Sequence, residues 1–65
     1  MKSYKFIKMN GCGNDFAIFD MRNTEDRIPR NKIQLIANRY KGIGCDQIIE
    51  LTLSDDKTTH MSIFN

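Results

Sequence analysis

Short apolar stretches separated by polar segments predict strands at the start of the chain. Residues 4–9 and 16–20 are apolar and rich in aromatic side chains, which is typical of strands. The second stretch is continuously apolar, which predicts burial on both of its faces. The residues between them, Gly11-Cys12-Gly13-Asn14-Asp15, favour turn conformations. We therefore expect a hairpin closed by an elaborate loop.

A helix is expected in the middle of the chain. Pro29 suits the first turn of a helix, and apolar side chains follow it with helical spacing. Gly42 is suited to end the helix. The apolar face would consist of Ile33, Ile36, Ala37 and Tyr40.

Alternating residues predict two more strands in the last third of the chain, separated by a polar turn at 54–57. The third strand would place apolar side chains on one face and polar ones on the other, and the fourth would begin near Thr59. The expected faces are Ile49, Leu51 and Leu53 against Glu50 and Thr52, then Met61 and Ile63 against His60, Ser62 and Phe64.

The length of the chain limits what it can be. Its 65 residues, 40% of them hydrophobic, would form one small domain, and such domains usually need disulfides, a metal or a partner. Cys12 and Cys45 are too few for a disulfide framework or a four-ligand zinc site. Because the last predicted strand is apolar almost to Asn65, we expect a piece of a longer protein.

The charge pattern points to no macromolecular partner. Ten Lys and Arg residues against eight Asp and Glu residues give a net charge of +2, and the basic residues are scattered. We therefore expect no nucleic-acid partner. The longest apolar run is 16–19, far too short to span a membrane, and no secretion signal opens the chain. A cytoplasmic protein with reduced thiols and no membrane partner is expected.

The glycine-rich segments do not have nucleotide-binding spacing. Gly11 and Gly13 are followed by Phe16 and a strand, where a dinucleotide motif needs a third small residue and a helix. The second segment, 42–44, follows a helix and precedes a strand, which is the wrong order for a phosphate site at a helix N-terminus.

The cysteines and the single histidine are weak candidates for chemistry. Backbone amides beside Cys12 could lower the pKa of its thiol, but the favoured interpretation is a small side chain that fills a gap beside a turn. Cys45 has the same interpretation. His60 is expected to be solvated or satisfied, and no metal site is predicted.

Five polar residues form the most suggestive set. Asn and Gln side chains offer both a donor and an acceptor, which suits a ligand that carries a carboxylate and an ammonium group, as an amino acid does. Local roles in turns and at a strand start are the alternative interpretation. The set comprises Asn14, Asp15, Asp46, Gln47 and Asn65.

Four segments, read in order, resemble the opening of diaminopimelate epimerase. The pattern K-M-x-G-x-G-N-D-F lies within residues 6–16, and G-x-G-x-D-Q follows some thirty residues later within 42–47. Residues 36–40 and 63–65 match as well, so the resemblance covers nearly the whole chain. The pair of patterns is far more specific than either glycine motif alone.

This resemblance implies a site and a reaction. The substrate-binding residues of the family fall on Asn14, Gln47 and Asn65, whereas both catalytic cysteines lie beyond Asn65. Cys12 and Cys45 occupy variable positions of their motifs and are not expected to be catalytic. The implied enzyme is an isomerase that inverts one α-carbon of LL-diaminopimelate to the meso form by two-cysteine acid/base chemistry, with no cofactor and no metal.

The resemblance also implies an architecture. The fold would be α+β, with a mixed, mostly antiparallel sheet curled around a helix. Residues 1–65 would form the N-terminal part of the first of two similar domains, without the central helix that covers the inner face of the sheet. The whole enzyme would be a cytoplasmic homodimer that serves lysine and peptidoglycan precursor synthesis, and the chain alone would be inactive.

Two alternatives from the residues and the resemblance remain open. One is a self-contained small α+β module that binds a polar ligand without catalysis. The other is a related cofactor-independent amino-acid racemase that acts on a different substrate.

Overall fold

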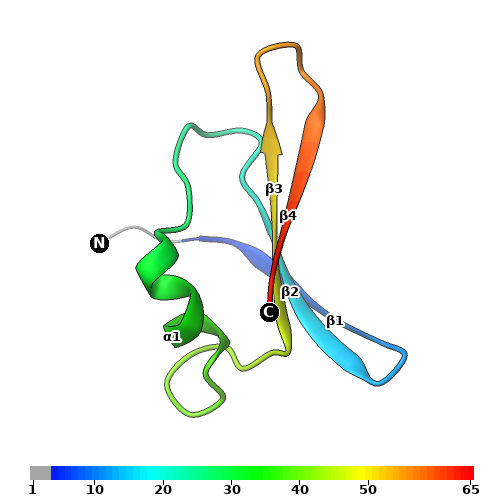
Figure 1. The fold of residues 1–65 in the computed structure, drawn as a ribbon, viewed down its shortest axis with the longest axis vertical. Coiled ribbons are helices and arrows are strands. Elements are labelled where there is room, and N and C mark those ends of the chain that lie inside the picture. Colours follow the sequence, from blue (N-terminus) through cyan, green and yellow to red (C-terminus); the bar gives the residue numbers. More distant parts are fainter. Residues whose placement is uncertain (1–3) are drawn as a thin grey trace.

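A computed structural model describes residues 4–65 as one mixed four-stranded sheet with a short helix on one side (Figure 1). The predicted α+β class is therefore confirmed. The strands lie side by side in chain order. They are β1 (Phe6–Gly11), β2 (Asn14–Asp20), β3 (Gln47–Leu53) and β4 (Thr59–Phe64), and the helical segment consists of the 3-10 turn η1 (Arg30–Lys32) and α1 (Ile33–Ala37).

The first hairpin is tighter than expected. β1 and β2 pair antiparallel from Phe6 opposite Phe19 to Gly11 opposite Asn14. Only Cys12 and Gly13 connect them, with φ values of 52° and 84°. Two consecutive positive φ angles are typical of the two-residue turns that match the twist of a hairpin. The prediction of an elaborate loop at 11–15 is therefore wrong, because residues 11, 14 and 15 are paired in the strands.

The helical segment crosses from β2 to β3, and these two strands are parallel, with Phe16 opposite Gln47 and Asp20 opposite Leu51. β3 and β4 then form a second antiparallel hairpin, from Leu53 opposite Thr59 to Ile48 opposite Phe64. The polar turn predicted at 54–57 is confirmed, since the Lys57 amide donates to the Ser54 carbonyl over 2.8 Å.

The helix is shorter than its sequence pattern predicts. It ends at Ala37, and Tyr40, which was expected on its apolar face, is 97% exposed. Asn38 has a ψ of 129°, outside the helix, and its side-chain oxygen accepts the amides of Tyr40 and Lys41 over 2.8 and 3.0 Å. This local competition by a short polar side chain stops the helix.

Gly42 does not end the helix, as the sequence predicted, but lies in the loop that follows it. Its amide donates to the Asn38 carbonyl over 2.9 Å, in the loop that folds back over the helix. A Cβ atom at this position would lie 2.2 Å from the Leu35 carbonyl oxygen. Only glycine allows so close an approach.

The two faces of the sheet differ sharply in burial. The helix face, the side covered by α1, contains Ala17 and Ile48, both 0% exposed, and Phe19 at 2%. The core around them is completed by Met21, Ile28, Ile33 and Cys45. Burial of both faces of β2 is therefore a wrong prediction, because Phe16 and Ile18, on the opposite face, are only half-buried.

The opposite side is called the open face here, because no element lies over it among residues 4–65 (Figure 1). Most of its side chains are apolar, and several are well exposed. The strand registers assign to it Ile7, Met9, Phe16, Ile18, Ile49, Leu51, Met61 and Ile63.

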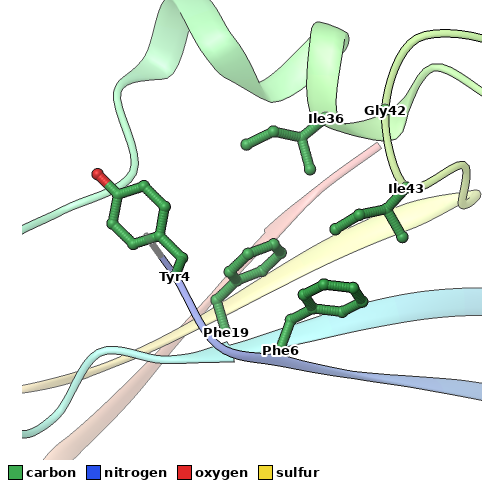
Figure 2. A pocket seen from close by; sticks show the side chains of 6 residues that line it. All are labelled: Tyr4, Phe6, Phe19, Ile36, Gly42 and Ile43. Carbon is green, nitrogen blue, oxygen red and sulfur yellow. The ribbon is translucent and has the colours of Figure 1, made fainter. Parts of the chain in front are cut away.

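A small apolar hollow lies on the helix side, between the first hairpin and α1 (Figure 2). Its volume is about 320 Å³, and the Phe6 and Phe19 rings form its floor with their centroids 5.6 Å apart. Ile36 and Ile43 face these rings from the helical side (Figure 2). The hollow extends the core toward β1.

No helix among the described residues is long and apolar enough to cross a membrane.

Candidate functional site

The topology gathers the five polar residues at one end of the sheet. β2 and β3 are parallel and start at the same end, where β4, antiparallel to β3, finishes. We call this the polar end; it consists of Asn14, Asp15, Asp46, Gln47 and Asn65. The sequence singled out these residues, and the structure places them together.

Three of the five lie on the open face. Gln47 is opposite Phe16, two residues after Asn14, so Asn14 and Gln47 point to the same side of the sheet. Continuing the β3–β4 register past Ile48 and Phe64 places Asn65 opposite Gln47. These are the residues that the family resemblance implies as substrate contacts.

The three amide side chains differ in the hydrogen bonds that they make. Gln47 Nε2 donates to Asn65 Oδ1 over 2.8 Å, so these two side chains are fixed against each other. Asn14 is exposed, one strand away from Gln47, and its amide side chain makes no hydrogen bond within the described part of the chain. The structure therefore joins Gln47 and Asn65 directly and leaves Asn14 beside them.

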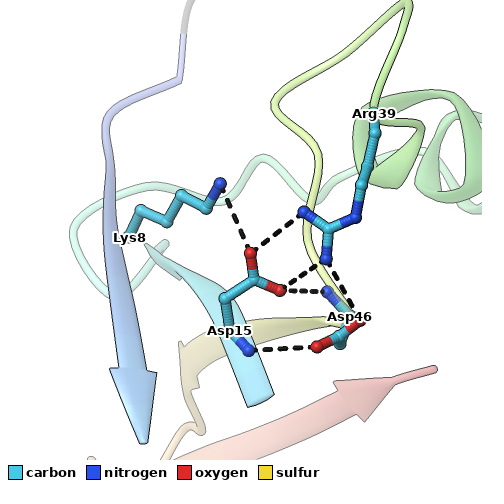
Figure 3. A network of polar contacts seen from close by, with 4 residues as sticks. All are labelled: Lys8, Asp15, Arg39 and Asp46. Carbon is cyan, nitrogen blue, oxygen red and sulfur yellow. Dashed lines mark hydrogen bonds and ion pairs between the residues drawn. The ribbon is translucent and has the colours of Figure 1, made fainter. Parts of the chain in front are cut away.

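The other two polar residues lie on the helix face and bond to each other (Figure 3). The Asp15 amide donates to Asp46 Oδ2 over 3.1 Å, and the Asp46 amide donates to Asp15 Oδ1 over 2.8 Å. The Asp46 amide also lies 3.0 Å from the Asp15 carbonyl oxygen. This reciprocal pair connects residues 31 positions apart in the sequence.

Two basic side chains complete this charged cluster. Arg39 donates to both carboxylate oxygens of Asp15, over 3.1 and 2.8 Å, and to Asp46 Oδ1 over 3.1 Å. Lys8 Nζ lies 3.4 Å from Asp15 Oδ2 (Figure 3). The cluster of Lys8, Asp15, Arg39 and Asp46 is thus balanced in charge.

The cluster shifts the pKa values of Asp15 and Arg39 toward their charged forms. Hydrogen bonds from the Arg39 side chain and then from the Asp46 backbone hold the pKa of Asp15 well below its ordinary value. The Asp15 hydrogen bond likewise raises the pKa of Arg39. Asp15 therefore stays ionised at neutral pH.

Sequence reasoning missed both basic members of the cluster. Arg39 lies in residues 36–40, one of the segments that resemble the epimerase, and Lys8 lies in the K-M-x-G-x-G-N-D-F pattern. Their presence in these segments was the available signal. No periodicity indicated that Arg39 would reach across to Asp15.

The two cysteines occupy different environments. Cys45 is 6% exposed in the core, where burial raises the pKa of its thiol, so its interpretation as a gap-filling side chain is confirmed. Cys12 is exposed in the tight turn itself, and the expectation that it fills a gap is wrong. His60 is exposed, as expected of a solvated side chain. Within residues 4–65 no group of three or more His, Cys, Asp or Glu could hold a metal ion.

Fold and site together define an α+β segment with a row of neutral amide side chains at one end of a mixed sheet. Comparison with known proteins matches this segment to diaminopimelate epimerases. The chain is 43% identical over 61 residues to the enzyme of Sphingopyxis alaskensis, 37% over 60 to that of Phenylobacterium zucineum, and 40% over 60 to that of Acidiphilium cryptum. The resemblance to diaminopimelate epimerase is thereby confirmed.

The matches cover nearly all of this chain and a small part of each relative. They include 94% of the chain and 23% of the Sphingopyxis alaskensis protein, and 92% and 22% for the other two. The chain therefore spans less than a quarter of the length of these relatives. No protein-family model matches it.

Proposed function

We propose that this chain is the N-terminal, substrate-contacting part of a diaminopimelate epimerase. In this proposal Asn14, Gln47 and Asn65 bind the amino-acid end of LL-2,6-diaminopimelate whose α-carbon is inverted. The observation that carries the proposal is the Gln47–Asn65 hydrogen bond of 2.8 Å, on the same face and at the same end of the sheet as Asn14.

The bond between the two amides leaves complementary groups for an amino acid. Gln47 uses its nitrogen and Asn65 its oxygen in this bond. Gln47 Oε1 then remains as an acceptor for an ammonium group, and Asn65 Nδ2 remains as a donor for a carboxylate. Asn14, on the neighbouring strand, offers a further donor and a further acceptor. Neutral amides bind such a zwitterion without an unpaired charge in the site.

Inversion of an α-carbon requires a base on one side of the carbon and an acid on the other. Cys45 does not suit either role, because it is buried in the core on the helix face, whereas the amides lie on the open face. Cys12 is exposed in the turn between β1 and β2, but it occupies a variable position of the motif that resembles the epimerase. We therefore assign the acid/base pair to two cysteines outside this chain, acting without a cofactor.

The proposal extends to the whole protein. It would have two similar domains with the site between them, form a homodimer, and supply precursors of lysine and peptidoglycan in the cytoplasm. The match to less than a quarter of each relative and the uncovered open face of the sheet support an enzyme of which this chain is one part.

The direct test is α-proton exchange by the complete protein that carries this chain. Incubated with LL-diaminopimelate in D₂O, it should incorporate deuterium at one α-carbon and form the meso isomer, measured by NMR and chiral chromatography. Asn14→Ala and Gln47→Ala should each lower kcat/KM by roughly 10- to 100-fold, the effect of losing a hydrogen bond to a charged group. Cys12→Ser and Cys45→Ala should retain the activity to within a few-fold.

The contrary outcomes separate the alternatives. Exchange with another amino acid but not with diaminopimelate would indicate the related racemase. Binding of diaminopimelate with no exchange would indicate a binding module. The 65-residue chain alone should give no exchange, and measurable exchange by that chain would contradict the assignment of both catalytic cysteines to positions outside it.

A further inference from the structure

We propose that Arg39 is a positioning residue of the substrate site, which holds Asn14 and Gln47 at a fixed separation by binding Asp15 and Asp46. This inference rests on the proposed function of the two amides. It assigns Arg39 no contact with the substrate.

Beyond the β2–β3 ladder, the backbone contact found between the two strand starts is the hydrogen bond from the Asp46 amide to the Asp15 carbonyl, over 3.0 Å. Among the paired residues of β2 and β3, the first pair is Phe16 with Gln47, so Asn14 lies two residues before the β2–β3 ladder. Asn14 is paired only on its other side, with Gly11 of β1. Gln47 is the first residue of β3 and follows a loop. Both amides therefore lie at the end of the sheet, where little backbone pairing joins β2 to β3.

The two aspartates are the immediate chain neighbours of these amides. Asp15 follows Asn14, and Asp46 precedes Gln47. The position of each aspartate is therefore coupled to the position of the neighbouring amide residue through a single peptide unit. The reciprocal Asp15–Asp46 bonds of 3.1 and 2.8 Å join the strand starts beyond the ladder. Two carboxylates in such proximity repel each other unless a cation lies between them.

Arg39 supplies that cation with suitable geometry. Its guanidinium bonds three carboxylate oxygens, two of Asp15 and one of Asp46, at 2.8 to 3.1 Å. A planar fork can bind both acids in one orientation, whereas an ammonium group binds as a point charge. The Arg39 side chain is 53% exposed, but that of Asp15 is only 14% exposed, so the carboxylate end of this pair is shielded from water.

Arg39 is itself held in place from the helical side. The Cys45 amide donates to the Ala37 carbonyl over 3.1 Å, which closes the loop that carries Arg39. Gly44, with φ of 79°, passes so close that a Cβ there would lie 3.0 Å from the Arg39 Cα. Because Asp15 and Arg39 lie on the helix face, Arg39 can influence the open-face amides only through the backbone.

The test uses the complete protein and three variants. Arg39→Ala should lower kcat/KM for LL-diaminopimelate by roughly 10- to 100-fold, the scale of a misplacement of about 1 Å in a binding group. Arg39→Lys, which keeps the charge and loses the planar guanidinium, should resemble Arg39→Ala more than the wild type.

Arg22→Ala is the matched control, because Arg22 forms a similar pair with Asp20, at 2.8 and 2.7 Å, at the other end of β2. It should stay within about two-fold of the wild type, as surface pairs contribute little.

A background in which Asn14 and Gln47 are both replaced distinguishes positioning from a loss of stability. If Arg39 acts through Asn14 and Gln47, Arg39→Ala should change kcat/KM by less than about three-fold once both amides are already replaced by alanine, since coupled residues are non-additive. A general structural defect would give the same fold-change in both backgrounds. Thermal midpoints of all variants, measured in parallel, confirm that each is folded.

Two results would overturn the inference: full activity in Arg39→Ala, or an equal fold-change in the two backgrounds. Absence of exchange in the wild type would instead refute the proposed function. Wild-type exchange that is unaffected by the loss of Asn14 and Gln47 would refute their assignment as substrate contacts. Failure of the inference and failure of the proposed function therefore give different results.

Discussion

At the scale of single residues, Glu50 shows how one buried charge organises a loop. Its side chain is 1% exposed on the helix face. It accepts the Ile28 amide over 2.8 Å and lies 3.4 Å from the Arg30 guanidinium. The alternating pattern placed Glu50 correctly on the face opposite Ile49, but it did not indicate burial, because the loop that supplies the donors is distant in sequence.

Replacing Glu50 should therefore destabilise the fold. Glu50→Ala leaves the buried Ile28 amide without an acceptor and should lower the free energy of unfolding by about 1–3 kcal/mol. Glu50→Gln keeps an oxygen at this position and should cost less. Urea unfolding of the complete protein measures both, with Thr52→Ala, on the same face of β3, as the control. Equal midpoints for Glu50→Ala and Thr52→Ala would contradict this role.

At the scale of elements, the side chains at the ends of the helix and of the first two strands determine how long these elements are. The Asn38 side chain accepts the amides of Tyr40 and Lys41 and stops α1 after Ala37, although the apolar spacing continued to Tyr40. Cys12 and Gly13, both with positive φ, close the first hairpin in two residues. The sequence predicted a turn there, but not that residues 14 and 15 would belong to the strand, since Asn and Asp are usual in turns.

The turn offers a direct test of this conformation. Asn tolerates positive φ better than Cys, so Cys12→Asn should stabilise the hairpin by a few tenths of a kcal/mol, to about 1 at most. Cys12→Val, with a β-branched side chain in the same conformation, should destabilise it. The thermal midpoint and the hydrogen-exchange protection of β1 in the complete protein measure both. A midpoint for Cys12→Val equal to or above that for Cys12→Asn would show that residue 12 does not adopt positive φ.

At the scale of the whole molecule, residues 4–65 cover only one side of the sheet. The helix face is packed under α1, whereas on the open face Ile7 is 66% exposed, Met61 61% and Ile63 50%. Contiguous exposed apolar surface of this kind marks an interaction site or an aggregation-prone surface.

We therefore expect the isolated 65-residue chain to be poorly folded or self-associated. Light scattering and sedimentation should show species larger than a monomer, and Ile7→Lys combined with Met61→Lys should reduce the association, because charges oppose the burial of that face. Tyr40→Lys is the control, since Tyr40 is 97% exposed but lies outside the open face. A folded monomer that is unchanged by these substitutions would contradict the prediction.

The sequence by itself determined the approximate positions of the local elements. Strands followed from apolar stretches and two-residue alternation, and turns from glycine and short polar residues. It also singled out the polar residues suited to an amino acid. These features depend on near neighbours along the chain. Only the tertiary structure decided that β2 and β3 are parallel, which brings Asn14 beside Gln47 and lets Arg39 bind Asp15, 24 positions away. It also decided which side of each strand is buried. The physical reason is that strand pairing and burial depend on contacts between distant segments, which local periodicity does not specify.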